Sequence, residues 1–177
     1  MKRSISAAIA LLGMVSFPNP GMAQIAAGAC IPEDQAQALV TVVLPDMLTT
    51  AQRICMPGLP RNAYLSNLNA GYMNRLRAAQ NAALPKARTA LGALAGPQGA
   101  VLAQSGFALP MIQTLMSGLV TKELQPEDCP AASKILRNLE PLPPANLASV
   151  IVTAIEVGAR KHKDEAAFQI CPTNTGE

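Results

Sequence analysis

Apolar residues recur at helical spacing along much of this chain, and the strongest such pattern lies between Leu142 and Arg160. From Leu147 onward this segment is apolar almost all round. Its polar exceptions fall at steps of three and four residues, at Ser149, Thr153, Glu156 and Arg160. That spacing leaves one narrow polar stripe on an otherwise apolar helix. Because such a helix packs on most sides, the pattern predicts a central helix over 144–160 with the other helices around it.

The N-terminal part contains a second long helical pattern, over 33–54. Its apolar residues recur at steps of three and four, and they keep their phase through Pro45. The pattern therefore predicts one helix that is kinked at Pro45 and about 33 Å long. The alternative is a chain that turns back at Pro45 and forms a helical hairpin.

The four cysteines limit how this first helix is tied to the rest of the chain. Cys30 and Cys55 flank the helix, whereas the Cα atoms of a disulfide lie within about 7 Å of each other. An unbroken helix keeps these two cysteines apart, so each would pair with Cys129 or Cys171. A hairpin at Pro45 would instead allow the pairs Cys30–Cys55 and Cys129–Cys171. The long-range pairing is the favoured one.

Shorter patterns complete an all-α fold. Proline- and glycine-rich segments separate helices expected over about 61–84, 86–94 and 109–124, a further helix starts within 125–130 and runs to about 139, and a last helical turn follows over 166–170. Tyr64 and Tyr72 fall on an apolar face, which favours core residues with hydroxyl groups in water over a ligand cage. We therefore expect a single disulfide-stapled bundle of about five to six helices, occupying 24–172.

The first 23 residues have the pattern of a secretory signal peptide. A basic start precedes an apolar stretch over 4–17, and small residues lead up to Ala23. We expect cleavage between Ala23 and Gln24. The apolar stretch is shorter than the roughly 20 residues that a membrane span needs, which disfavours an uncleaved anchor. The protein is therefore expected in the periplasm or outside the cell, with a frayed tail over 173–177.

Cysteine usage agrees with export. All four cysteines follow the signal peptide, and an even number in an oxidising compartment predicts two disulfides. The sequence contains no C-x-x-C motif. This excludes the thioredoxin-type redox motif, the zinc ribbon and the C-x-x-C-H haem attachment site.

Composition argues against nucleic acid as a partner. Removing the first 23 of the 177 residues leaves 154. These contain 12 of the 14 basic residues and all 11 acidic ones. A balance this near neutrality lacks the basic face that nucleic acids require. Aromatic residues make up 3% of the chain and Trp is absent, so platforms for stacking bases or sugars are not expected.

Groups that support catalysis are scarce. The one histidine, His162, lies between two lysines, where a surface role is favoured. Motifs of nucleophilic hydrolases, zinc proteases, P-loop NTPases and EF hands are absent from the sequence. Glu156, with Arg160 one turn later, is the best candidate for a carboxylate-based enzyme. We expect a non-enzymatic protein without metal or cofactor, the alternatives being an enzyme that uses Glu156 and a structural envelope component.

An uncharged stretch from Thr89 to Thr121 gives the main indication of function. A buried helix after a loose connection is the favoured interpretation, a partner-binding apolar surface comes second, and Gln104 and Gln113 disfavour a membrane span. The residues expected on such a surface are Phe107, Leu109, Met111, Ile112, Leu115 and Met116. We therefore expect an exported helical protein that binds an unidentified protein or amphiphile through apolar surface, with membrane contact but no span.

Overall fold

The computed structural model describes residues 30–161 and 169–171, and within the helices it leaves out the side chains of 95–100, 102, 115, 119 and 161. The all-α fold class is confirmed, because the described residues form five α-helices: α1 (Glu33–Cys55), α2 (Ala70–Gln104), α3 (Ala108–Glu123), α4 (Cys129–Leu139) and α5 (Pro144–Lys161). Short 3-10 turns over Met56–Gly58 and Pro126–Asp128 follow α1 and precede α4. The signal peptide, its cleavage site at Ala23 and Gln24, His162 and the tail over 173–177 lie outside the described residues.

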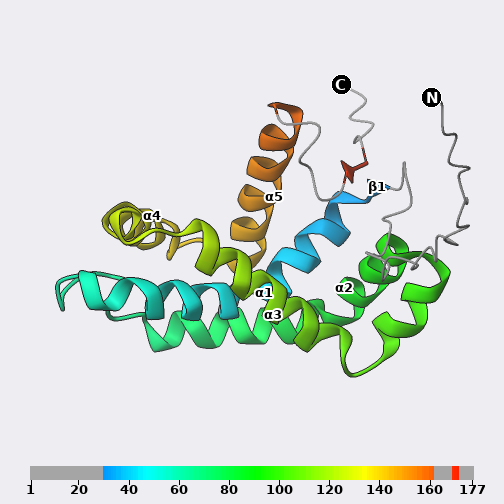
Figure 1. Ribbon diagram of the computed structural model, residues 1–177, viewed down its shortest axis with the longest axis horizontal. Coiled ribbons are helices and arrows are strands. Elements are labelled where there is room, and N and C mark those ends of the chain that lie inside the picture. Colours follow the sequence, from blue (N-terminus) through cyan, green and yellow to red (C-terminus); the bar gives the residue numbers. More distant parts are fainter. Residues whose placement is uncertain (1–29, 162–168, 172–177) are drawn as a thin grey trace, which may run out of the picture.

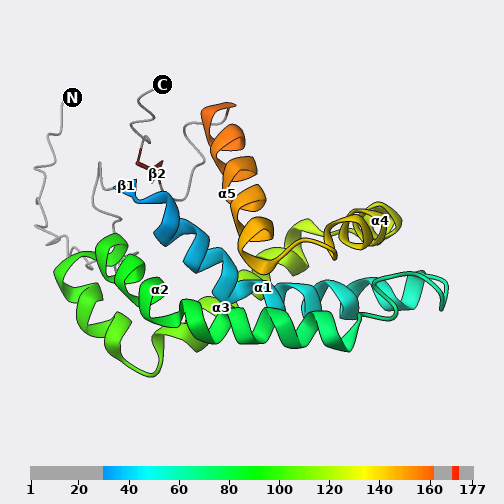
Figure 2. The same ribbon diagram turned by 180° about the vertical axis from the view of Figure 1, so that it is seen from behind.

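Helix α1 is the helix on which the others pack. It contacts α2, α3 and α5, and it is continuous through Pro45, as predicted. The helix changes direction along its length, from the blue segment to the cyan one (Figures 1 and 2). It is buried continuously from Thr41 to Pro45. The hydroxyl of Thr41 donates to the carbonyl oxygen of Gln37 at 2.7 Å, so this threonine is satisfied within its own helix and can lie in the core.

The helix predicted over 144–160 forms as α5, but it does not occupy the central place expected of it. It stands up from the rest of the fold and packs against α1 along one side (Figure 1). Leu147, Ala148 and Val152 form its buried stripe, whereas Val150 and Val157 are 49% and 45% exposed. An apolar side chain is free to lie at the surface, so an almost wholly apolar helix does not have to be surrounded.

Helix α2 begins and ends later than the sequence pattern predicts. Residues 61–69 form turns, and Asn69 then caps the helix, since its side-chain oxygen accepts from the backbone N–H of Tyr72 at 3.2 Å. The helix continues through Pro85 and through the glycine–proline segment over 96–99 to Gln104. Each proline removes one backbone hydrogen bond, and here neither loss ends the helix.

One disulfide joins the two ends of the described chain. Cys30 and Cys171 are bonded, with their Cα atoms 4.8 Å apart. They flank a parallel pair of two-residue strands, β1 (Cys30–Ile31) and β2 (Gln169–Ile170), and the N–H of Cys171 donates to the Ile31 carbonyl at 2.9 Å. Extended backbone over 169–170 therefore replaces the helical turn predicted there. Both disulfides are long-range, which is the arrangement that an uninterrupted α1 requires.

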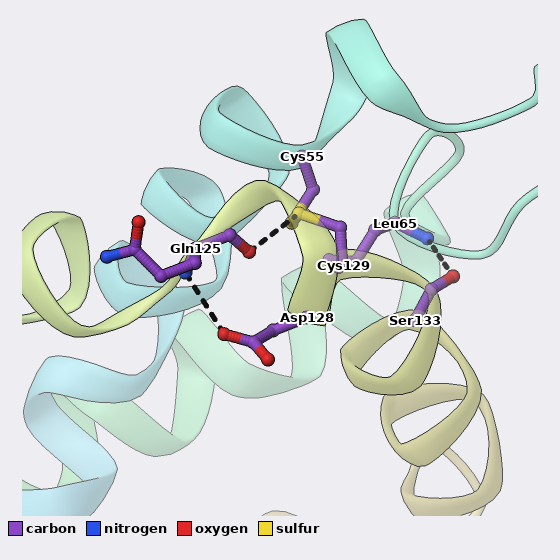
Figure 3. The surroundings of a disulfide bond; sticks show 6 residues. All are labelled: Cys55, Leu65, Gln125, Asp128, Cys129 and Ser133. Carbon is purple, nitrogen blue, oxygen red and sulfur yellow. Dashed lines mark hydrogen bonds between the residues drawn. A yellow bond between two sulfur atoms is a disulfide. The ribbon is translucent and has the colours of Figure 1, made fainter.

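The second disulfide joins the end of α1 to the start of α4. Cys55 and Cys129 are bonded with their Cα atoms 5.3 Å apart, and both are buried against Leu65 (Figure 3). Next to this bridge, the buried N–H of Leu65 donates to the hydroxyl of Ser133 at 3.2 Å. The bridge and this hydrogen bond together fasten the loop over 59–69 and helix α4 to α1.

Candidate functional site

Three large apolar side chains are exposed where α2 meets α3. Val101, Phe107 and Met111 are 75%, 80% and 64% exposed. They lie on the last turn of α2, on the connecting turn and on the first turn of α3, and we call them the apolar tip. Large exposed apolar side chains gathered in one place are typical of contact sites, whereas single scattered ones need no explanation.

The other residues predicted for a contact surface are less accessible. Leu109, Ile112 and Met116 are half-buried, and the side chain of Leu115 is outside the described part of the structure. The favoured interpretation of this stretch, a buried helix, holds only in part. Ala103 and Ala108 are buried, whereas the residues of the apolar tip, which neighbour them in the chain, are exposed. The surface that the structure presents is therefore smaller than the predicted one, and it includes Val101, which sequence reasoning omitted.

A small apolar space, here called the hollow, lies between α1, α2 and α3 beneath the first turn of α3. Nine of its lining residues are apolar and one is a cation: Leu39, Val42, Val43, Leu84, Ala87, Leu91, Ala108, Leu109, Ile112 and Arg88. The space measures about 10 Å³, roughly the room of one water molecule.

The polar ties of α3 lie beyond the hollow, toward the middle of the helix. The amide of Gln113 donates to Asp46 Oδ2 on α1 at 2.7 Å, and the hydroxyl of Thr50 donates to that of Ser117 at 3.4 Å. The first turn, over 108–112, contains only apolar side chains. It therefore covers the hollow through apolar contact alone.

Charge is strongly segregated along the chain. From Met47 to Lys122 the sequence contains no acidic residue and seven basic ones: Arg53, Arg61, Arg75, Arg77, Lys86, Arg88 and Lys122. Every charged side chain on α2 is consequently basic. The near-neutral net charge of the whole chain conceals this asymmetry, which is visible in the sequence and which the sequence analysis missed.

Two neighbouring cations on α2 differ in their partners. Lys86 pairs with Asp34 at 2.9 Å, and this hydrogen bond lowers the pKa of the Asp34 carboxyl. Arg88 lines the hollow and has no acidic partner among the described residues. An exposed guanidinium without a carboxylate partner is well suited to a carboxylate or phosphate, which it can bind in a bidentate manner.

Glu156 is half-buried and forms an ion pair with a residue of its own helix. Its carboxylate lies 3.7 Å from the guanidinium of Arg160, one turn along α5. Pairs at this spacing are common on helix surfaces and contribute little. Glu156 is not among the residues that line the hollow. The geometry therefore gives no support to an enzyme built on Glu156.

Tyr64 and Tyr72 lie in the core, but their hydroxyl groups are not in water as expected. Both hydroxyl oxygens are buried, and neither has a partner at hydrogen-bonding geometry among the described residues. Burial raises the pKa of both phenols, and the nearby carboxylate of Glu140 raises it further. The guanidinium of Arg75 lies over the ring of Tyr72, 5.5 Å from its centre. Both phenols therefore stay protonated in the folded protein at neutral pH.

Among the described residues, no group of His, Cys, Asp and Glu side chains could hold a metal ion. No helix there is both long enough and apolar enough to cross a membrane.

Comparisons with protein-family models, curated proteins and solved structures find no match to this chain. Any function proposed for the apolar tip and the hollow therefore depends on their own geometry and charge.

Proposed function

We propose that this protein binds an anionic amphiphile surface, such as a membrane leaflet rich in acidic lipids, through the apolar tip. The observation that carries the proposal is the exposure of Phe107 and Met111 beside α2, a helix whose charges are all basic. Apolar side chains enter the boundary between headgroups and acyl chains, while nearby cations are attracted to the acidic headgroups.

The free energies that these side chains contribute suit reversible contact with a membrane surface, without a membrane-spanning helix. A Phe or Met side chain contributes about 1.5–3 kcal/mol when fully buried, and each cation near an acidic membrane adds about 1 kcal/mol. Phe107, Met111 and the free cation Arg88 together supply several such contributions. A protein partner is the second explanation of the apolar tip, and the lack of acidic residues over 47–122 favours the anionic surface over it.

Export is part of the same proposal. Two disulfides are consistent with an oxidising compartment, and the sequence over 1–23 has the pattern of a cleaved signal peptide. The mature chain then begins at Gln24, in the periplasm or outside the cell. N-terminal sequencing of the exported protein checks this, and a mature chain that retains residues 1–23 would contradict it.

Vesicle flotation with the mature protein tests the binding. We expect the protein to float with vesicles of phosphatidylglycerol and phosphatidylcholine, and less so at high salt, because salt screens exposed charges. The double variant Phe107→Ser/Met111→Ser should weaken the association at least about tenfold, since it removes both apolar contacts. The control is Val150→Ser/Val157→Ser on α5, which changes two exposed apolar positions away from the apolar tip and should bind normally.

Three outcomes would contradict the proposal. The first is a mature protein that stays out of the vesicle layer altogether, and the second is one that floats equally well with pure phosphatidylcholine vesicles. The third is loss of flotation in the α5 control variant alone, which would place the contact surface on α5 instead of the apolar tip.

A further inference from the structure

We propose that α2 forms a second part of the membrane contact: its outward face, over 74–89, lies flat on acidic phospholipid headgroups while the apolar tip enters the layer. This inference rests on the proposed function and goes beyond it. It assigns the headgroup contact to one face of one helix, and it fixes the orientation of the protein on the membrane.

One side of α2 packs into the fold. Its buried residues Tyr72, Leu76, Ala87 and Ala90 recur at helical spacing. The amide of Gln80, which falls in the same series, donates to a backbone carbonyl of α1 at 2.6 Å. The opposite side of the helix is therefore turned away from α1.

The side of α2 that is turned away from α1 is open to solvent and uncharged along its middle. Its residues are all exposed and follow one another at steps of three or four: Asn74, Ala78, Asn81, Pro85 and Thr89. They are small or polar, whereas a helix that sinks into the acyl boundary carries large apolar side chains on the buried face. This face therefore suits contact at the level of the headgroups.

Cations border this face. Arg77 and Arg88 are eleven residues apart, which is about three helical turns, so they lie on the same border about 16.5 Å from each other. Both are exposed, and neither lies within ion-pair distance of an acidic side chain among the described residues. Arg75, on the other border, is also exposed. Such guanidinium groups suit the phosphate oxygens of headgroups, which they bind through two parallel hydrogen bonds.

This face of α2 and the apolar tip lie on the same edge of the molecule. In both views the first part of α2 runs along the lower edge, beneath α1, and the turn between α2 and α3 is the lowest point (Figures 1 and 2). A flat surface placed against this edge contacts the turn and α2 together. The headgroup contact is thus continuous with that of the apolar tip.

Charge complementarity selects an acidic layer for this edge. All of α2 and the turn after it belong to the segment from Met47 to Lys122, which contains no acidic residue. An acidic membrane surface is therefore attracted by the cations of α2 and meets no carboxylate of that helix. A neutral layer would gain nothing from them.

Single tryptophans test the orientation, because the sequence contains no tryptophan of its own. We expect Phe107→Trp to be quenched by bromine on the acyl chains of vesicles of phosphatidylglycerol and phosphatidylcholine. Asn81→Trp should be quenched by a spin label on the headgroup and only weakly by the brominated chains. The control is Thr153→Trp, exposed on α5 away from this edge, which neither quencher should affect (Figure 1).

Charge variants test the role of the cations. Arg77→Gln/Arg88→Gln should weaken vesicle flotation about tenfold or more, because each cation near an acidic membrane contributes to binding. The matched control is Lys134→Gln/Arg137→Gln on α4, which removes the same charge from two exposed positions away from this edge and should bind normally (Figure 1).

The outcomes separate this inference from the proposed function. Quenching of Phe107→Trp without any quenching of Asn81→Trp would overturn the contact of α2 and leave the apolar tip as the membrane contact. Equal weakening by the two double charge variants would also overturn it, because attraction would then follow net charge and not this face. Absence of quenching at both Phe107→Trp and Asn81→Trp would remove both proposals.

Discussion

The side-chain amide of Gln113 on α3 donates a hydrogen bond to the carboxylate of Asp46 on α1, with Nε2 and Oδ2 2.7 Å apart. Gln80 of α2 donates to the same oxygen at 3.3 Å and to the backbone carbonyl of Val42 at 2.6 Å. Side chains of α2 and α3 thus both bond to one half-buried carboxylate of α1. This residue, Asp46, directly follows the proline within α1. This contact sets the position of α3, and with it the position of the apolar tip and of the cover of the hollow.

Removing this carboxylate should loosen the three-helix contact. We expect Asp46→Ala to lower the free energy of unfolding by about 1–3 kcal/mol, because the amide of Gln113 loses its acceptor and the amide of Gln80 loses one of its two. Asp46→Asn keeps one acceptor oxygen and should cost less. Urea denaturation followed by circular dichroism measures both variants. The control is Asp34→Ala, which breaks an exposed ion pair and should change little; an equal effect of Asp46→Ala and Asp34→Ala would contradict the expectation.

The hydroxyl of Ser133 should contribute substantially to the stability of the fold, although the group is small. It accepts the hydrogen bond of the buried Leu65 N–H beside the disulfide of Cys55 and Cys129 (Figure 3). Ser133→Ala leaves that N–H unpaired in the core, so we expect a loss of about 1–3 kcal/mol in the free energy of unfolding. Ser66→Ala is the matched control, because the Ser66 hydroxyl donates to Pro60 in an exposed loop where water can replace it. Equal stability of the two variants would show that water reaches Leu65.

The two disulfides should differ in their response to a reductant. Cys30 is exposed and Cys171 half-buried, whereas Cys55 and Cys129 are both 1% exposed. Thiol–disulfide exchange requires access to the sulfur, so mild reductant should open Cys30–Cys171 first and leave Cys55–Cys129 intact until the protein unfolds. Alkylation of the free thiols followed by mass spectrometry identifies which pair has opened. Reduction of both pairs at the same rate under native conditions would contradict this order.

The elements that sequence reasoning located well are those with long, uninterrupted periodicity. The first helix, the helix after Phe107 and the helix that begins at Cys129 all form within a few residues of the expected bounds. The length of the first helix also favoured the long-range pairing of the cysteines, since a rise of about 1.5 Å per residue separates the ends of an unbroken helix. The end of α2 was misplaced because glycine and proline within 96–99 were given the weight of a helix terminator, and in this helix they are accommodated.

The relative places of the helices could not be read from hydrophobicity. Helix α1 is central although it contains Thr41 and Thr50, because Thr41 is satisfied by its own backbone and Thr50 by Ser117. Helix α5 is peripheral although it is the more apolar of the two. For the candidate site, the exposed Phe107 and Met111 were in the predicted set, but the contact of Asp46 with Gln80 and Gln113 joins residues far apart in the chain, and no periodicity indicates such pairs.

The two buried tyrosines should make the protein sensitive to alkaline pH. An unfolded tyrosine loses its proton at about pH 10, whereas burial and the carboxylate of Glu140 raise the pKa of Tyr64 and Tyr72 in the folded protein. Above about pH 10 the unfolded chain therefore releases protons that the folded chain keeps, so the contribution of these two phenols to the free energy of unfolding is constant below that pH and falls as the pH rises above it.

Lysines also lose their protons near pH 10, so replacing both phenols separates the effect of the tyrosines from that of the lysines. In Tyr64→Phe/Tyr72→Phe the alkaline loss of stability should be smaller than in the parent protein, and stability at neutral pH should be unchanged or higher, because two unpaired buried hydroxyl groups are removed. The sequence contains two tyrosines, so the absorbance of tyrosinate in the parent protein reports on this pair alone. It should rise together with the loss of helical circular dichroism, since the phenols ionise only on unfolding. A rise at about pH 10 in protein that is still helical would show that water already reaches these hydroxyl groups in the folded state.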